Sequence, residues 1–290
     1  MADTNDRPSF SEGDATVRIT WVDYQMSKGG NPMLAFKLEG TDGDSKGART
    51  THRIPLIGKM MWRFYNFCRA AGVNAKDAFL ARKSPEDLLE IFVGKEVIAT
   101  FESSKYKDKD GINRVGYDVA TTKPVDPEAQ AVAAFTAGDF PTGDSLVEIT
   151  WVDLVESSTG KPMLNFKLVS SIGPKAGAEH TYRAVLTDSS VWKHDDLATA
   201  VGLVPAQAFA TRHDPDALLQ TWVGKKLKVI GKESTYEDRD GNERKGVDIV
   251  AIESLDPKIR ERMELARKAR MTGGTLDDAP ATGGDNEIPF

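Results

Sequence analysis

Cationic and aromatic side chains recur in this chain at one fixed spacing. Lys37 is followed 130 residues later by Lys167, and Tyr106 by Tyr236. Lysine holds anionic groups and a tyrosine ring stacks on flat partners, so the repeated set predicts binding of an anionic ligand with planar rings. Catalysis is not expected, because the chain has no Gly-x-x-x-x-Gly-Lys-Ser/Thr loop and no repeated carboxylate–histidine set.

The same spacing relates longer stretches of the chain. Residues 20–23 (Thr-Trp-Val-Asp) return as residues 150–153, and residues 32–38 (Pro-Met-Leu-Ala-Phe-Lys-Leu) return as 162–168 with a single change. A chain of 290 residues is long enough for about two domains. The sequence therefore predicts two copies of one domain, each able to bury its own core.

Each copy has the hydrophobic pattern of three strands, a helix and two strands. Val17, Ile19 and Trp21 alternate with polar residues, which is typical of a half-buried strand. Residues 58–71 show a helical pattern, and Asp110-Gly111 between two strand patterns indicates a hairpin. Five strands with a helix between the third and the fourth are the arrangement of the OB-fold, a small barrel whose strand 2–3 face binds oligonucleotides.

We therefore expect a mainly β chain of two tandem five-stranded OB-fold barrels, each with a helix between strands 3 and 4, plus a disordered tail. The predicted bounds are a flexible arm at 1–14, a first OB-fold domain at 15–123, a linker at 124–145, a second OB-fold domain at 146–256, a basic helix at 257–271 and a disordered acidic tail at 272–290.

The tryptophans are interpreted by the faces on which they fall. Trp21 and Trp151 alternate in step with core residues, so we expect core packing unless a bulge turns the strand over. Trp62 and Trp192 stand at a helix start, where a plug for the barrel is favoured over a stacking platform. Lysine on the opposite face of the second strand marks that face as wet, although an ordinary solvated face gives the same pattern.

Composition limits the remaining possibilities. Cys68 is the only cysteine and the four histidines are scattered, so we expect neither disulfides nor a metal site, and no cofactor. No apolar run approaches the roughly 18 residues of a membrane helix. The acidic start lacks the positive charge of a secretory signal, so we expect no membrane association and a cytoplasmic location. The net charge of −6 is concentrated at the end, because residues 272–290 hold four acids and no base.

The last six residues, Asp-Asn-Glu-Ile-Pro-Phe, resemble the acidic tip of bacterial and phage single-stranded DNA-binding proteins, which typically ends Asp-Asp-Asp-Ile-Pro-Phe. The resemblance implies a tip that recruits replication, recombination and repair enzymes, with an apolar end entering a pocket that has a basic rim. The alternative is a merely solubilising tail. The partner-binding residues implied are Asp285, Glu287, Ile288, Pro289 and Phe290.

The second strand, which follows a Gly-x-Pro-Met-Leu-x-Phe pattern, and the Val-Gly-Lys before the fourth strand also resemble phage proteins of this family. The resemblance implies sequence-independent binding of single-stranded DNA in a bacteriophage, within the host cytoplasm, by a non-enzyme. Two domains in one chain depart from the family's tetramer of single domains, so a monomer or dimer is favoured. The DNA-binding residues predicted are Lys37, Arg53, Lys105, Tyr106, Lys107, Lys109, Arg114, Lys167, Arg183, Tyr236 and Arg244.

The two hairpins differ in charge. The first holds four bases against two acids, and the second holds three bases against four acids. The sequence therefore predicts tighter DNA binding by the first domain, and a hairpin tyrosine that stacks on a base or packs on its own strands. The alternative function is an OB-fold scaffold that contacts proteins and has no significant affinity for DNA.

Overall fold

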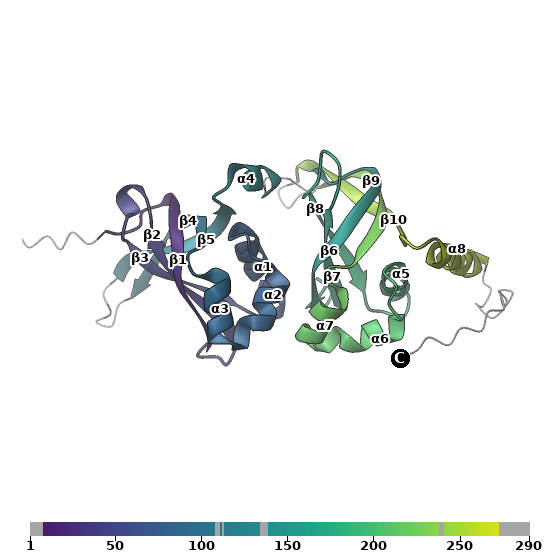
Figure 1. Cartoon of the computed structure of the whole chain (residues 1–290), viewed down its shortest axis with the longest axis horizontal. Helices are drawn as coiled ribbons and strands as arrows, with labels where there is room; N and C mark the ends of the chain where they lie inside the picture. The colour runs from purple at the N-terminus through teal and green to yellow at the C-terminus, as the bar shows by residue number, and fades with distance from the viewer. Residues whose placement is uncertain (1–7, 108–110, 112, 134–138, 238–240, 273–290) are drawn as a thin grey trace, which may run out of the picture.

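The computed structural model describes residues 8–107, 111, 113–133, 139–237 and 241–272. It contains two structural repeats, which stand side by side along the long axis of the molecule (Figure 1). Repeat 1 is built from strands and helices in the order β1 (Gly13–Met26), β2 (Pro32–Gly40), β3 (Arg49–Pro55), α1 (Met61–Ala70), α2 (Ala75–Leu80), α3 (Pro85–Phe92), β4 (Glu96–Lys107) and β5 (Asn113–Pro124).

Repeat 2 has the same order of elements. Helix α4 (Pro127–Ala133) stands between the repeats, and helix α8 (Pro257–Thr272) follows the last strand. The elements of repeat 2 are β6 (Gly143–Glu156), β7 (Pro162–Ser170), β8 (Glu179–Val185), α5 (Trp192–Ala200), α6 (Pro205–Ala210), α7 (Pro215–Trp222), β9 (Lys226–Glu237) and β10 (Glu243–Glu253).

Each repeat forms one five-stranded antiparallel sheet. The strand orders are β3-β2-β1-β4-β5 and β8-β7-β6-β9-β10, so the first strand of each repeat lies at the centre. Val17 pairs with Gly40 in repeat 1 and Val147 with Ser170 in repeat 2, a constant shift of 130 residues. Two five-stranded antiparallel sheets with several helices confirm the predicted fold at that level, and the strand orders are consistent with tandem OB-like domains.

The short helices begin at residues that satisfy free backbone N–H groups. The Asn74 side chain accepts hydrogen bonds from the N–H groups of Lys76 and Asp77 at the start of α2. Asp214 does the same at α7, where Pro215 occupies the first helical position. Ser84 caps α3, the counterpart of α7, in the same way, whereas α6, the counterpart of α2, has no such cap, with Val204 before its first turn.

A β-bulge in the first strand of each repeat decides where its tryptophan points. Ile19 pairs with Leu38 and Trp21 with Lys37, which leaves Thr20 as an extra residue. The extra residue inverts the alternation, so Val22 is buried and Trp21 lies on the outer face, 44% exposed. The core interpretation of Trp21 is therefore wrong, and the reason is the one-residue bulge.

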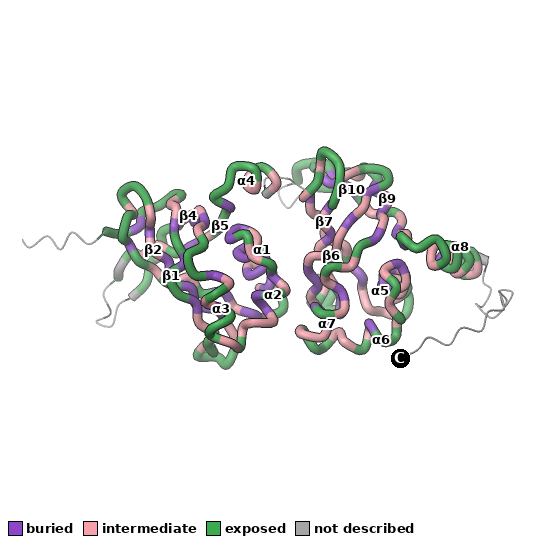
Figure 2. Tube along the Cα trace, in the orientation of Figure 1, coloured by how far each residue is buried: buried purple, intermediate pink, exposed green. Residues whose placement is uncertain are grey.

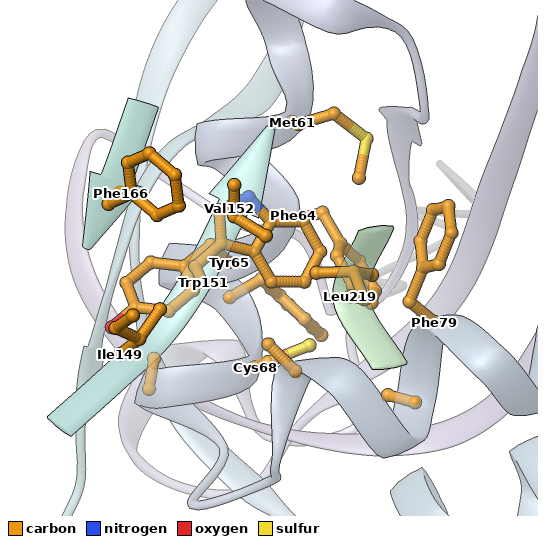
Figure 3. Close-up of a cluster of buried hydrophobic side chains, with 14 of the residues drawn as sticks. Met61, Phe64, Tyr65, Cys68, Phe79, Ile149, Trp151, Val152, Phe166 and Leu219 are labelled. Carbon is orange, nitrogen blue, oxygen red and sulfur yellow. The ribbon is translucent and has the colours of Figure 1, made fainter. Parts of the chain in front are cut away.

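Repeat 2 has the same bulge, between Ile149 and Trp151. Trp151 is nevertheless only 2% exposed, because repeat 1 covers it. The rings of Phe64, Tyr65 and Phe79 lie 5.9–6.0 Å from the Trp151 ring, between centroids. Figure 3 shows this cluster, in which Trp151 of β6 meets aromatic side chains of the repeat 1 helices. Trp151 is thus buried, but between the repeats. The sequence had suggested the interior of its own sheet.

Polar contacts surround this aromatic cluster. The Tyr65 hydroxyl lies 2.9 Å from the Thr150 hydroxyl. At the other side, the Arg82 guanidinium donates to both carboxylate oxygens of Asp216, at 2.6 and 3.1 Å. Buried residues of both repeats belong to one hydrophobic cluster, and buried stretches of both lie where the repeats face each other (Figure 2). The two repeats therefore share one hydrophobic core and are held in a defined orientation.

Parts of the segments predicted as an arm, a linker and a basic helix pack on the two repeats. Phe10, in the predicted flexible arm, is buried and stacks on Phe101 with ring centroids 4.2 Å apart. The predicted linker contains α4, whose Val132 carbonyl accepts a hydrogen bond from Arg69. In the predicted basic helix, α8, Met263 is buried. No helix among the described residues is long and apolar enough to cross a membrane.

Candidate nucleic-acid interface

The outer face of the β1-β2-β3 sheet combines an aromatic ring with cations. Trp21, Lys37 and Thr51 stand opposite one another on the three strands, and Arg53 lies one step further along β3 on the same face. The Lys37 ammonium lies 5.8 Å from the centroid of the Trp21 ring. Lys37 and Arg53 are exposed. A flat ring can stack on a base of a nucleic-acid strand while the cations beside it bind the phosphates of that strand.

The bulge residue fixes this geometry. The Thr20 hydroxyl donates to the Lys37 carbonyl at 3.1 Å. This bond joins β1 to β2 at the bulge, where the alternation of side chains in β1 is inverted. Thr150 makes the matching bond to Lys167 at 3.3 Å. The same local device therefore presents a tryptophan outward in both repeats, and the difference between them must come from what lies against it.

The corresponding face of repeat 2 is occupied. The Lys167 ammonium donates to the Glu179 carboxylate at 2.6 Å and to the Thr181 hydroxyl at 3.0 Å, and Arg69 of repeat 1 lies 3.8 Å from Glu179. Lys167 is only partly exposed, so the wet face expected from its sequence is not present here. Arg183 remains exposed beside it.

Burial perturbs the acid on this covered face. Removal from water raises the pKa of the Asp153 carboxyl to about 6, and the nearby positive charge of Lys167 opposes that rise. The outer face of repeat 2 is therefore covered by protein around Trp151 and Asp153, whereas that of repeat 1 is open.

Arg49 is a functional candidate that the sequence reasoning missed. It stands on β3 on the same outer face as Arg53, is exposed, and pairs with Glu39 at 2.9 Å. The residue 130 positions later is Glu179, the acid that holds Lys167. A comparison of the two copies for charge reversals, position by position, is the signal that would have found it.

The hairpin tyrosines combine the two roles that the sequence left open. Tyr106 and Tyr236 are each about half exposed, at 52% and 49%. The ring of Tyr106 lies over Gly116 and that of Tyr236 over Gly246, so close that a methyl group on either glycine would meet the ring at 3.0 or 3.1 Å. One face of each ring thus packs on its own hairpin and the other is free for stacking.

The remaining hairpin residues are placed unevenly. Lys105 is exposed on β4, beyond the point where Phe101 pairs with Gly13 at the start of β1, and so lies away from Trp21, which is toward the other end of β1. Arg244 is exposed on β10. Lys107 and Arg114 belong to strands, but their side chains lie outside the described residues, as does all of Lys109.

A second pair of tryptophans faces outward. Trp62 on α1 is 50% exposed and Trp192 on α5 is 44% exposed, so the barrel-plug interpretation is wrong for both. The Trp192 ring lies beside two cations, Lys193 at 5.8 Å and Arg270 of α8 at 5.4 Å. It borders a groove of about 520 Å³, whereas the matching hollow beside Trp62 is about 70 Å³.

No protein-family model and no curated protein sequence matches this chain. Solved structures that resemble it include single-stranded DNA-binding proteins, at TM-scores too low to carry an argument. The crystal structure of the wild-type single-stranded DNA-binding protein from Thermus aquaticus is 14% identical, with a TM-score of 0.21 and coverage of 85% of this chain and 95% of that one. Yeast RPA bound to ssDNA is 12% identical, with a TM-score of 0.23 and coverage of 45% and 86%.

The turn between β2 and β3 carries a further short motif. Residues 43–47 read Gly-Asp-Ser-Lys-Gly, the spelling of a hydrolase nucleophile turn. That chemistry requires a serine raised on a strand-to-helix turn, but here the Ser45 hydroxyl donates to the Asp42 carbonyl between two antiparallel strands. The motif is therefore a turn sequence. Among the described residues, no group of three or more histidines, cysteines and acids is placed to hold a metal ion.

The predicted partner-binding tip lies outside the described residues. Asp285, Glu287, Ile288, Pro289 and Phe290 all follow residue 272, the last one described. The structure thus brings together Trp21, Lys37, Arg49 and Arg53 on one face, and the tip stays a prediction from the sequence.

Proposed function

We propose that this chain is a non-enzymatic protein that binds single-stranded DNA without sequence preference, chiefly through the outer face of repeat 1. The observation that carries the proposal is the exposed Trp21 ring with the Lys37 ammonium 5.8 Å from its centroid. Each repeat is proposed to be an OB barrel, in which the strand 2–3 face is the usual oligonucleotide surface.

The chemistry of this face suits single strands. An unpaired base can stack on Trp21, which contributes about 1–3 kcal/mol per base. Lys37, Arg49 and Arg53 then meet the phosphates on either side, so that affinity falls as salt rises. Repeat 2 contributes less in this proposal, because Trp151 is covered and Lys167 is held by Glu179.

Titration of the full chain with labelled oligo-dT tests the proposal. Trp21→Ala should weaken binding by roughly 5- to 100-fold, because one stacked base is lost. Lys37→Ala should weaken it less and reduce the salt slope by about one. Lys167→Ala is the matched control, since it removes the same side chain from the covered face.

The control also decides between repeats. Lys167→Ala should leave the affinity for oligo-dT unchanged, after its folding is checked by circular dichroism. An equal loss with Lys37→Ala and Lys167→Ala would show that the two faces contribute alike and would contradict the proposal. If the wild-type protein fails to bind oligo-dT at low salt, DNA binding is refuted and the protein-interaction scaffold is the remaining function. The protein contact on the outer face of repeat 2 favours that alternative.

We propose in addition that the tip at residues 285–290 recruits enzymes of DNA replication, recombination and repair, in a bacteriophage. The support is the resemblance of the sequence to the tips and second strands of that family. The acids of residues 272–290 should compete with DNA for the cationic face of repeat 1. Deleting them should raise the affinity for oligo-dT at low salt, and an unchanged affinity would remove competition from the proposal.

A further inference from the structure

The contact between the repeats joins two unlike surfaces. One is the helical surface of repeat 1, made by Phe64, Tyr65, Phe79 and Arg82. The other is the tryptophan surface of repeat 2, made by Thr150 and Trp151 of β6 and Asp216 of α7. Because the repeats share one sequence pattern, each also has the surface that it does not use in this contact.

The unused tryptophan surface belongs to repeat 1. It consists of Thr20, Trp21 and Glu86, each 130 residues before its counterpart. Thr20 and Glu86 are exposed and Trp21 is 44% exposed. Two of the three residues are identical to their counterparts, and the third keeps its negative charge.

The unused helical surface belongs to repeat 2. It consists of Asp195, Phe209 and Arg212. His194, the counterpart of Phe64, is fully buried inside repeat 2, against Phe209 and Trp222. The Arg212 guanidinium stacks 3.9 Å from the Phe209 ring and donates to the Phe209 carbonyl, as Arg82 does with Phe79 at the same 3.9 Å. Arg212 therefore has the same local geometry as Arg82, which pairs with Asp216. Within the described chain, however, neither Arg212 nor Glu86 has an ion-pair partner.

From this correspondence we propose that a second copy of the chain docks the helical surface of its repeat 2 on the tryptophan surface of repeat 1. Arg212 would pair with Glu86 as Arg82 pairs with Asp216. Phe209 would pack on Trp21 as Phe79 packs on Trp151. The Thr20 hydroxyl, which donates to the Lys37 carbonyl, would lie at the edge of this contact, as Thr150 does beside Tyr65.

The symmetry of this contact makes it open-ended. It is heterologous, since two different surfaces meet, and the same step can be repeated by each added copy. Helix α8 leaves the helical surface free, because its Arg267 and Arg270 bind Asp196 on a different side of α5 from Asp195. The product is a head-to-tail chain of molecules rather than a closed dimer.

The docked state should be weaker than the contact within the chain. Asp195 replaces the aromatic Tyr65, and the His194 ring is already buried inside repeat 2, so docking buries less apolar area. Association between separate molecules also loses the advantage of covalent linkage. A docked copy would cover Trp21 and exclude the DNA contact proposed there, but the test below contains no DNA and does not rest on that contact.

Sedimentation velocity of the full chain over a concentration series tests the proposal. The weight-average sedimentation coefficient should rise with concentration beyond the value of a dimer. R212E and E86R should each weaken association by about tenfold or more, because like charges then meet at the centre of the contact. Lys232→Glu changes the net charge as R212E does, at an exposed position on β9, and should leave association unchanged.

Mixing the variants gives the decisive result. Each of the R212E and E86R chains carries one reversed charge, so a one-to-one mixture can form complementary pairs at every contact and should regain association. A wild-type coefficient that does not change with concentration would overturn the proposal. So would R212E chains that associate as strongly as the Lys232→Glu control, or a mixture that associates no better than its components.

Discussion

The outer faces of the two repeats differ in exposure although their side chains are nearly the same. Trp21 and Trp151 are each presented outward by a bulge, with Lys37 and Lys167 opposite them. One tryptophan is exposed to solvent and the other is covered by aromatic rings of the neighbouring repeat. A residue type at a repeated position therefore does not determine its exposure; the surface that lies against it does.

The largest contrast is expected when each tryptophan is removed. Trp151→Ala should lower the free energy of unfolding by about 3–5 kcal/mol, because a buried aromatic ring is lost and a cavity remains between the repeats. Trp21→Ala should cost about 1 kcal/mol or less, since its ring is partly in water. Urea unfolding of both variants measures the difference, and equal costs would show that the repeats do not share a core in solution.

The second expected difference between the two outer faces is a pH-dependent stability, caused by the covered Asp153. The folded pKa of Asp153 is about 6, above its ordinary value, so the stability linked to its protonated form is present at low pH and lost as pH rises through 6. Asp153→Asn should therefore stabilise the fold by about 1–2 kcal/mol at pH 7 and by little below pH 4. Asp23→Asn is the matched control on the open face; a similar gain there would argue against burial as the cause.

The smallest contrast isolates one ion pair. Arg82→Ala and Arg212→Ala remove the same stack on phenylalanine and the same bond to its carbonyl. Only Arg82 also binds Asp216, with 11% of its side chain exposed. Arg82→Ala should thus be less stable than Arg212→Ala by about 1 kcal/mol in dilute solution. Chemical denaturation at low protein concentration measures both stabilities. Equal stabilities would mean that water solvates Asp216 as well as Arg82 does, so that the ion pair adds nothing.

The sequence predicted the features that repeat. The shift of 130 residues and the alternation of apolar residues were enough to place two five-stranded sheets and the outward side of Lys37. It did not reveal the bulge at Thr20, because both copies carry the same residue there and comparing them gives no contrast. Alternation without that one-residue offset put Trp21 on the wrong face.

The contact between the repeats was missed for a different reason. Phe64 and Tyr65 fit the apolar side of a helix that covers its own sheet, and nothing local distinguishes a partner from a distant part of the chain. The informative positions were those at which the copies diverge. Tyr65 against Asp195, and Arg49 against Glu179, mark where one repeat meets protein and the other meets solvent.

The burial of Trp151 against repeat 1 has a consequence for the order of synthesis. Phe79 leaves the ribosome 72 residues before Trp151 (151 − 79), which at ordinary elongation rates is roughly 4–15 s. For that interval the aromatic rings of α1 and α2 have no cover, while every finished neighbouring molecule displays an exposed Trp21. Once residues 143–156 have been translated, β6 can form and bring Trp151 over these rings; until then Trp21 of a neighbouring molecule is a competing partner for them.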